Sequence, residues 1–196
     1  MPGDQLWVQT SNIGPPPRCF HKMAFDSDRK VVVLFGGFAQ NTFFNDTWEW
    51  DGALWTQVSN TGPAKRFAHV MCFDSARKKT VLFGGTLPGN PNTIYGDTWE
   101  WDGTDWSQVS QDGALARAYA TMDFDAKSKQ SVLFSGTKIS DTWAWDGNEW
   151  KQNSNFGPKA VIASAMAFDG KNPVLFGGQD NVLGNIGETW QWNGKY

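Results

Sequence analysis

The stretch "NDTWEWDGALWTQV", Asn45–Val58, contains three tryptophans and an Asp-Gly pair. Related wording follows three more times, as "GDTWEWDGTDWSQV", "SDTWAWDGNEWKQN" and "GETWQWNGKY". A phrase that recurs in fixed order indicates a repeat architecture, in which each unit buries its apolar surface against its neighbours. The phrase therefore belongs to one structural unit that the chain uses four times.

Two further markers recur in step with this phrase. The sequence "VLFGG", once "VLFSG", stands at residues 33–37, 81–85, 132–136 and 174–178. A Met-x-Phe-Asp block precedes it each time, beginning at residues 23, 71, 122 and 166. We therefore expect a single domain over residues 1–196, with repeats at about 18–58, 66–109, 117–153 and 161–196 and an additional strand at 5–10.

The first repeat predicts four β-strands and no helix. Its apolar runs are short, lack the helical period and are separated by turn residues. The expected strands, here named a to d, are Cys19–Phe25, Val31–Gly37, Asp46–Trp50 and Leu54–Val58. The second strand is apolar without alternation, which indicates burial on both faces. A four-stranded antiparallel sheet that is covered on both faces and repeated is typical of a β-propeller blade, in an all-β fold.

These features resemble the Kelch repeat. The resemblance rests on the Gly-Gly that closes strand b, the tryptophans of strands c and d, and a period of about 50 residues. The Asp-Thr-Trp-x-Trp-Asp-Gly wording is similar to the tryptophan-rich Kelch repeats of bacterial proteins. The resemblance covers essentially the whole chain and implies a propeller, but the family includes interaction modules, carbohydrate-active enzymes and ligase adaptors.

The fourth copy of the phrase lacks the tryptophan of its strand d. A matching segment stands at the amino-terminus, where "QLWVQTSNIGPPPR" aligns Trp7 with Trp55 of "ALWTQVSNTGPAKR". We expect this segment to complete the last blade, which hides the edge strands and groups the twelve tryptophans in four sets of three. Closure within one chain gives a four-bladed monomer, closure between two chains gives an eight-bladed homodimer, and a piece of a larger propeller is a third alternative.

The loops that connect strands d to a and b to c are predicted to share one face. The b–c loops differ in every repeat, and variable loops on a rigid scaffold commonly bind ligands. The d–a loops place Arg18, Arg66 and Arg117 in one register, with Lys159 nearby in the fourth copy. The resemblance to Kelch propellers that recognise acidic peptides implies that these side chains bind a carboxylate. The alternative is a structural role within each blade.

Four aromatic residues in the two longer b–c loops are further candidates for ligand binding. They are Phe38, Phe43, Phe44 and Tyr95. Such side chains either stack on a sugar or anchor a partner protein, or fold back and cover the blade. The repeated tryptophans are expected to pack between blades instead.

The sequence predicts no catalytic residue, metal site or cofactor. His21 and His69 occupy matching positions, which favours packing, and no motif around them matches the Kelch-fold copper oxidases. A carboxylate register at the start of strand c is expected to accept backbone hydrogen bonds. Asp123 interrupts its column and is the best single candidate for chemistry. Cys19 and Cys72 are expected to be free thiols.

Composition limits the partners. The net charge of −3 does not favour nucleic acid, and no apolar run or leader suggests a membrane or export, so cytoplasmic is the default location. We expect a non-catalytic binding module whose ligand, a protein segment or a glycan with acidic groups, docks on the face of the d–a and b–c loops. The alternatives are a carbohydrate-active enzyme that works at the channel mouth and a structural fragment of a larger propeller.

Overall fold

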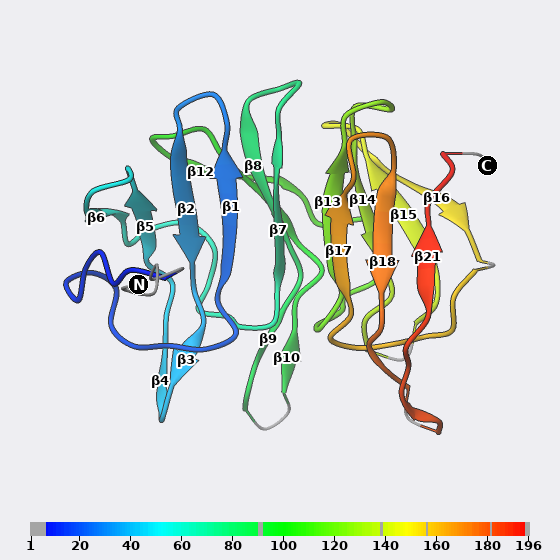
Figure 1. The fold of residues 1–196 in the computed structure, drawn as a ribbon. Coiled ribbons are helices and arrows are strands. Elements are labelled where there is room, and N and C mark those ends of the chain that lie inside the picture. Colours follow the sequence, from blue (N-terminus) through cyan, green and yellow to red (C-terminus); the bar gives the residue numbers. More distant parts are fainter. Residues whose placement is uncertain (1–6, 90–91, 138, 156, 181, 195–196) are drawn as a thin grey trace, which may run out of the picture.

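The computed structural model describes residues 7–89, 92–137, 139–155, 157–180 and 182–194, and within them it contains strands and turns but no helix. No helix in these ranges therefore has the length and apolarity to cross a membrane. The strands form four consecutive antiparallel sheets, which confirms an all-β fold with four blades (Figure 1).

Three blades have four strands each, and the order of the strands in each sheet follows their order in the sequence. Blade 1 consists of β1 (Lys22–Asp26), β2 (Val31–Phe35), β5 (Thr47–Trp50) and β6 (Trp55–Ser59). Blade 2 consists of β7 (Val70–Asp74), β8 (Lys79–Phe83), β11 (Thr98–Trp101) and β12 (Trp106–Ser110). Blade 3 consists of β13 (Thr121–Asp125), β14 (Gln130–Phe134), β15 (Thr142–Trp145) and β16 (Trp150–Ser154).

The fourth blade has three strands within the described residues. They are β17 (Ala165–Phe168), β18 (Pro173–Phe176) and β21 (Thr189–Gln191). Strands a to d were thus predicted at the correct places in the repeat, with boundaries that differ by at most three residues. The strand a prediction began early because Cys19 forms an isolated bridge ahead of β1.

Three b–c loops contain a small hairpin that the sequence did not predict. The strands are β3 (Phe38–Ala39) with β4 (Thr42–Phe43), β9 (Thr86–Leu87) with β10 (Thr93–Ile94), and β19 (Gln179–Asp180) with β20 (Gly184–Asn185). These hairpins all project from the same side of the arc of blades, at the bottom of Figure 1.

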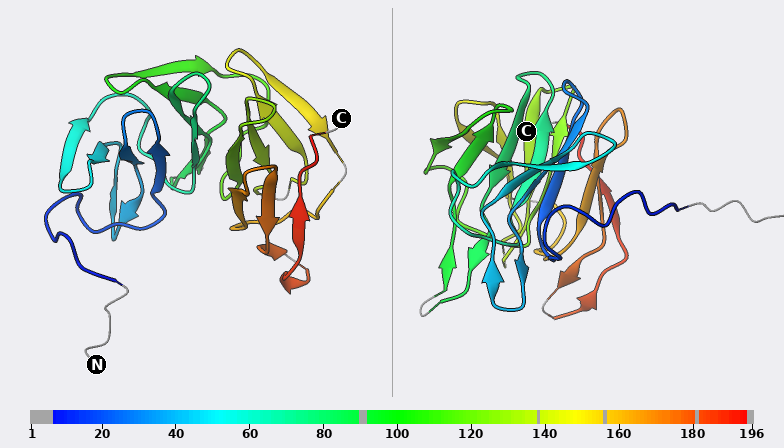
Figure 2. Two further views of the ribbon diagram at one scale, coloured as in Figure 1. Left: turned by 45° about the horizontal axis from the view of Figure 1, so that its top comes forward. Right: turned by 90° about the vertical axis from the view of Figure 1, so that its left-hand side faces the viewer.

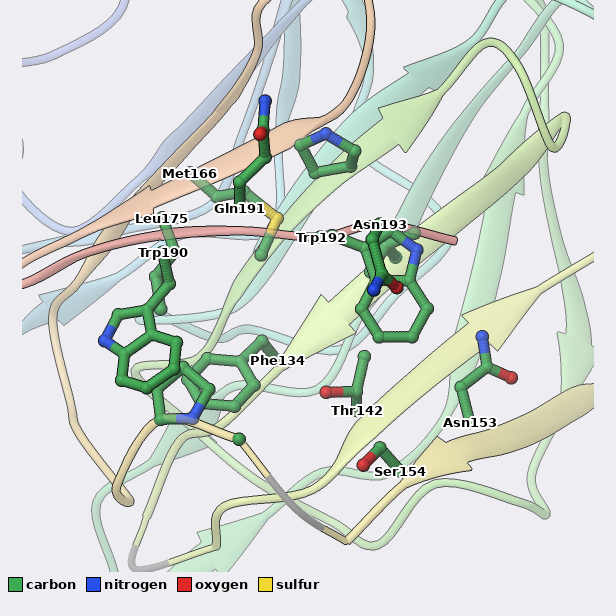
Figure 3. A pocket seen from close by; sticks show the side chains of 14 residues that line it. Phe134, Thr142, Asn153, Ser154, Met166, Leu175, Trp190, Gln191, Trp192 and Asn193 are labelled. Carbon is green, nitrogen blue, oxygen red and sulfur yellow. The ribbon is translucent and has the colours of Figure 1, made fainter. Parts of the chain in front are cut away.

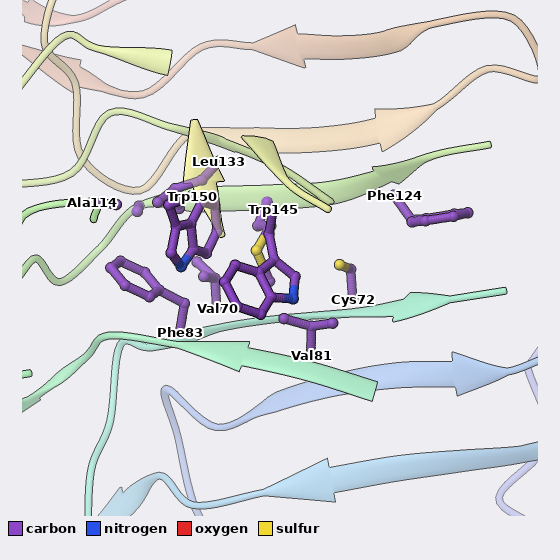
Figure 4. Packing of buried hydrophobic residues seen from close by; sticks show 11 residues of the cluster. Val70, Cys72, Val81, Phe83, Ala114, Phe124, Leu133, Trp145 and Trp150 are labelled. Carbon is purple, nitrogen blue, oxygen red and sulfur yellow. The ribbon is translucent and has the colours of Figure 1, made fainter. Parts of the chain in front are cut away.

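The apolar core lies between neighbouring blades. The adjacent strand b residues Val33 and Leu34 point to opposite faces of the sheet and are 0% and 3% exposed, which confirms burial on both faces. Between blades 2 and 3, Trp145 and Trp150 lie against Val81 and Phe83 (Figure 4). These two tryptophans, like Trp101 and Trp106 between blades 1 and 2, therefore pack between blades, as expected from their repetition.

Backbone hydrogen bonds join the blades near the axis. The residue two positions before strand a repeats in each blade, as Phe20, Ala68, Tyr119 and Ala163. The N–H of Ala68 donates to the carbonyl of Phe20, Tyr119 donates to Ala68, and Ala163 donates to Tyr119, at 2.9–3.1 Å. This series fixes the spacing of adjacent blades and runs from blade 1 to blade 4.

The four blades form an open arc, with blades 1 and 4 at its two ends (Figure 2). The expected strand at 5–10 does not complete blade 4 here. Residues 5 and 6 lie outside the described ranges, residues 7–10 form no strand, and Trp7 is 93% exposed. This segment runs beside blade 1, across the arc from blade 4, so it lies too far from blade 4 to pair with it (Figure 2).

Candidate functional site

The d–a and b–c loops share one face of the arc, which we call the loop face. Isolated antiparallel bridges join a d–a residue to the following b–c hairpin in three blades. The pairs are Cys19 with Phe38, Phe67 with Thr86, and Ile162 with Gln179. The loop face is therefore a continuous surface built from both kinds of connection.

The three arginines of the d–a register are buried in ion pairs with the strand c carboxylates. The guanidinium of Arg66 donates to both oxygens of Asp97 at 2.6 and 2.8 Å, and also to the carbonyl of Gly84 at 3.0 Å. Arg18 pairs with Asp46 in the same way, and Arg117 pairs with Asp141. These bidentate pairs connect the entrance of strand a to the start of strand c within each blade.

This arrangement does not fit the prediction that the arginines grip a ligand directly. The side chains of Arg18, Arg66 and Arg117 are 2%, 0% and 0% exposed. The carboxylate that each one binds belongs to the protein itself, so the alternative of a structural role is the one that the geometry favours. Burial opposes ionisation of Asp97, yet the hydrogen bonds and charge of Arg66 lower the pKa of that carboxyl below its ordinary value.

Two of the predicted aromatic residues pack on these arginines. The ring of Phe44 lies 3.8 Å from the guanidinium carbon of Arg18, and that of Tyr95 lies 4.0 Å from the guanidinium carbon of Arg66. Such cation–π contacts cover the buried pairs from the loop side. Phe44 and Tyr95 therefore fold back on the blade, and their predicted role in ligand binding stays a prediction.

The other two predicted aromatics belong to a group of five rings at the centre of the loop face. Phe38 and Phe43 pack on Phe67, with ring centroids 4.9 and 6.0 Å apart. Phe20 stacks on Phe38 at 5.8 Å and meets the edge of Tyr119 at 6.0 Å. We call Phe20, Phe38, Phe43, Phe67 and Tyr119 the aromatic cluster; Phe20 is 50% exposed within it.

Phe20 and Tyr119 were not predicted as ligand-binding residues. Both occupy the left-handed backbone region, with φ of 53° and 58°, as do Ala68 and Ala163 at the same place in their blades. A left-handed residue other than glycine costs about 1–2 kcal/mol, so the blade-to-blade hydrogen bonds hold this geometry in place. The sequence did contain a signal for these two residues. At this position of the repeat, two large aromatic residues alternate with two alanines.

A cavity of about 330 Å³ opens next to the aromatic cluster. Its lining comes from blades 2, 3 and 4 and is largely apolar, with Phe67, Ile94, Ala118, Tyr119 and Ile162 among its residues. Thr86 and Thr137 add hydroxyl groups. The cavity and the cluster together form an apolar depression with polar edges on the loop face.

Lys159 is the one exposed side chain among the four cations predicted to bind ligand. It lies on the blade 4 side of the loop face, near Val161 and Ile186, and is not part of the aromatic cluster. The predicted site residues thus divide into three groups, namely buried arginines with their aromatic covers, the aromatic cluster, and Lys159 alone.

The candidates for chemistry have structural partners. Asp123 is half-buried, and its two oxygens accept the backbone N–H groups of Phe124 and Phe168 at 2.8 and 2.7 Å, which ties β13 to β17. Burial raises the pKa of Asp123. His69 is 1% exposed and meets the ring of Phe35 edge-on at 5.6 Å, which agrees with a packing role.

In the part of the chain that the structure describes, no cluster of side chains is arranged for metal or redox chemistry. No group of three or more His, Cys, Asp or Glu side chains is placed to hold an ion there. Cys19 and Cys72 are free thiols, as expected, with Cys19 exposed and Cys72 buried. Burial raises the pKa of Cys72 well above its ordinary value, so its thiol stays protonated.

Comparison with known proteins supports the architecture. The family model described as the KLHDC2/KLHL20/DRC7 Kelch-repeats domain matches residues 5–178. No curated protein matches the chain. Kelch propeller domains generally mediate protein interactions. With four successive blades and a match over most of its length, the chain belongs to the Kelch-repeat family.

Proposed function

We propose that this protein is a non-catalytic interaction module that binds a segment of a partner protein on its loop face. The aromatic cluster is the centre of the contact, and the adjacent cavity receives an apolar side chain of the partner.

The observation that carries the proposal is the exposure of Phe20. This ring is half exposed although it contacts three other aromatic rings. Its left-handed backbone and the hydrogen bond that its carbonyl accepts from Ala68 fix the direction in which it leaves the chain. An aromatic ring that is exposed and held rigidly has little conformational entropy to lose on binding, which is typical of interface anchors.

The expected charge of the ligand depends on which of the predicted cationic side chains remain accessible to it. Arg18, Arg66 and Arg117 are neutralised by their own aspartates, so they contribute position rather than charge. An acidic group on the partner would meet Lys159 at the side of the loop face. We therefore expect an apolar anchor to contribute most of the affinity and an acidic residue to contribute less.

The test uses alanine substitutions that the scaffold already tolerates. Phe20→Ala and Tyr119→Ala place in blades 1 and 3 the residue that blades 2 and 4 carry at the same position. Leu54→Ala is the matched control, because Leu54 is 53% exposed in the c–d turn of blade 1 and lies away from the loop face. Thermal unfolding of each variant establishes that the fold is retained.

A library of random peptides displayed on phage supplies the probe. We expect selected peptides to bind the parent protein and Leu54→Ala equally, and to bind Phe20→Ala and Tyr119→Ala at least about tenfold more weakly, as loss of a hot-spot ring predicts. Equal binding to all four proteins would contradict the proposed face. Failure to select any peptide, together with binding of the parent protein to a glycan array, would favour a glycan ligand instead.

A further inference from the structure

A cavity of about 280 Å³ that no described residue fills lies between blades 3 and 4, away from the loop-face cluster (Figure 3). Its lining includes Phe134 and Thr142 of blade 3 and Gly157 of the loop that follows blade 3. Leu175 and Trp192 of blade 4 line the other side. We call this cavity the tryptophan socket, because the corresponding places in the other blade interfaces hold an indole.

Between blades 1 and 2 the same place is occupied by Trp106. Its ring lies 5.4 Å from that of Phe35 and 5.6 Å from that of Trp101, and its N–H donates to the hydroxyl of Thr47 at 2.8 Å. A Cβ added to Gly62 would lie only 2.7 Å from Trp106. The indole thus packs between an aromatic ring of each blade, a threonine hydroxyl and a glycine.

Between blades 2 and 3 the arrangement repeats with Trp150. Its ring lies 5.0 Å from Phe83, its N–H donates to the hydroxyl of Thr98 at 2.8 Å, and Gly113 lies against it. Trp106 and Trp150 are 9% and 7% exposed. Two independent interfaces therefore show the same way of seating a strand d tryptophan.

The socket between blades 3 and 4 has each of these partners in place. Phe134, Thr142 and Gly157 correspond by their place in the repeat to Phe35, Thr47 and Gly62, and Trp192 corresponds to Trp101. A Cβ added to Gly157 would meet nothing within 4 Å. The socket is thus shaped for an indole that no described residue supplies.

The matching tryptophan of this sequence is Trp7. It is 93% exposed, in contrast to Trp106 and Trp150. Gly14 already lies against Trp55 of blade 1, with a Cβ-to-ring distance of 2.7 Å, as Gly62 lies against Trp106. Seven positions separate Trp7 from Gly14, as they separate Trp55 from Gly62. Trp7 is therefore spaced to enter the blade that lies next to blade 1.

Among the described residues no blade occupies that place, because blades 1 and 4 stand at the two ends of the arc (Figure 2). Both ends expose apolar side chains that are covered in the interior of the arc. Met23 at the blade 1 end is 52% exposed, whereas its counterparts Met71 and Met122 are each 6% exposed. Phe176 at the blade 4 end is 56% exposed, whereas its counterpart Phe83 is fully buried.

The two ends also carry complementary polar groups. Blade 1 presents Trp50 and Trp55, whose counterparts Trp101 and Trp106 donate N–H bonds to the preceding blade. Blade 4 presents Thr189 and Gln191 at the positions where Thr47 and Glu49 accept those bonds. A blade 4 surface placed against a blade 1 surface therefore repeats the interior interface.

We propose that a second copy of this chain fills the tryptophan socket with its Trp7. The Trp7 segment then adds a fourth strand to blade 4 of its partner, and the two arcs close head to tail into an eight-bladed ring. Two equivalent contacts form at once, and they remove both exposed ends without bending either arc. Closure within one chain would require the arc itself to close.

A disulfide placed across the new strand pair tests the proposal. In blade 1, Glu49 of β5 is opposite Thr56 of β6, and this register places Val8 opposite Gln191. We use Val8→Cys with Gln191→Cys in a Cys19→Ser background, because Cys19 is exposed and Cys72 is buried. Mild oxidation should give a covalent dimer on a non-reducing gel, with twice the chain mass of 21.8 kDa.

Each other outcome overturns the proposal. An intrachain disulfide in a monomer would show that the segment closes its own chain, and the absence of any disulfide would show that it does not enter the socket. Val8→Cys with Ser107→Cys is the control, because Ser107 is exposed on β12, the strand d that already completes blade 2 opposite Glu100, and it should form no cross-link.

The native mass of Trp7→Ala provides a second, independent measurement. Trp7 has no packing role inside this arc, so the variant should keep the circular dichroism spectrum of the parent and its cooperative unfolding. Light scattering should give a dimer for the parent protein and a monomer for Trp7→Ala. A variant that stays dimeric, or a parent that is monomeric, would contradict the proposal.

Discussion

The indole of Trp106 in blade 2 donates its N–H to the hydroxyl of Thr47 in blade 1, across the interface between the two blades, at 2.8 Å. Trp150 makes the same bond to Thr98 one blade further on. The repeated phrase therefore places a donor on strand d of one blade and an acceptor on strand c of the blade before it. The interfaces between blades 1 and 2 and between blades 2 and 3 are therefore each specified by a bond as well as by apolar packing.

Replacement of Thr47 by valine should destabilise the protein. Valine keeps the shape of threonine but leaves the buried N–H of Trp106 without its acceptor, which costs about 1–3 kcal/mol. Urea unfolding followed by tryptophan fluorescence measures the free energy of unfolding. Thr142→Val is the control in the Trp7→Ala background, since Thr142 faces the empty socket, and a comparable loss there would show that the indole bond is not the cause.

Gly113 and Gly157 should respond differently to alanine. Both have a positive φ, of 107° and 150°, so alanine is strained at either site. A Cβ at Gly113 would also lie 2.6 Å from Trp150, whereas a Cβ at Gly157 meets nothing within 4 Å. In a Trp7→Ala background we expect Gly113→Ala to lower the melting temperature more than Gly157→Ala. Equal effects would show that backbone strain alone decides.

Arg66→Met should be among the most destabilising single changes in the protein. Arg66 is fully buried, and its removal leaves the carboxylate of Asp97 without its bidentate partner; breaking a buried pair in this way costs about 3–5 kcal/mol. Chemical denaturation provides the measurement. The variant Lys151→Met breaks exposed pairs with Asp146 and Glu149 and should change the free energy of unfolding too little to measure. A small effect of Arg66→Met would restore the view that this arginine is kept for a ligand.

His69 should make the protein less stable as the pH falls below the ordinary histidine pKa of 6.5. Burial, followed by the charge of Arg66, lowers the pKa of His69 well below that value in the folded state. The unfolded chain therefore binds a proton that the folded chain excludes, and stability declines as the pH drops through 6.5. Melting temperatures between pH 7.5 and pH 5.5 should show the decline in the parent protein, and His69→Phe should reduce it. An unchanged slope would place the dependence on other groups.

The sequence predicted the blades well because each strand is short and the residues that mark its start and end are close to it in the sequence. The Asp-Gly turns are adjacent to the strands they join, and the side chain of Asp51 accepts the N–H groups of Ala53 and Leu54 within the turn. The apolar strand b could be recognised without knowing its neighbours. Strand boundaries moved by a few residues where bridges and bulges depend on the neighbouring segment.

The candidate site was predicted less completely. The variable loops were recognised as one face, which the isolated bridges confirm. The arginines were seen as a register, but their partners lie 24–31 positions away, so the sequence alone did not show that each charge is already neutralised. Phe20 and Tyr119 were missed as candidate ligand-binding residues. Their position on the loop face follows from a left-handed backbone conformation that hydrogen bonds between blades impose.

The sequence by itself determined a Kelch-type repeat of four blades, the strands within each blade and the role of the tryptophans between blades. Those properties depend on local patterning and on self-similarity along the chain. Only the tertiary structure decided which groups are neutralised, which rings stay exposed and where the socket for a missing tryptophan lies. Burial, ion pairing and the curvature of the arc arise from contacts between distant segments. Trp7 and Thr142 hold the repeat positions of the bonded pair Trp106 and Thr47, yet they do not touch in this chain.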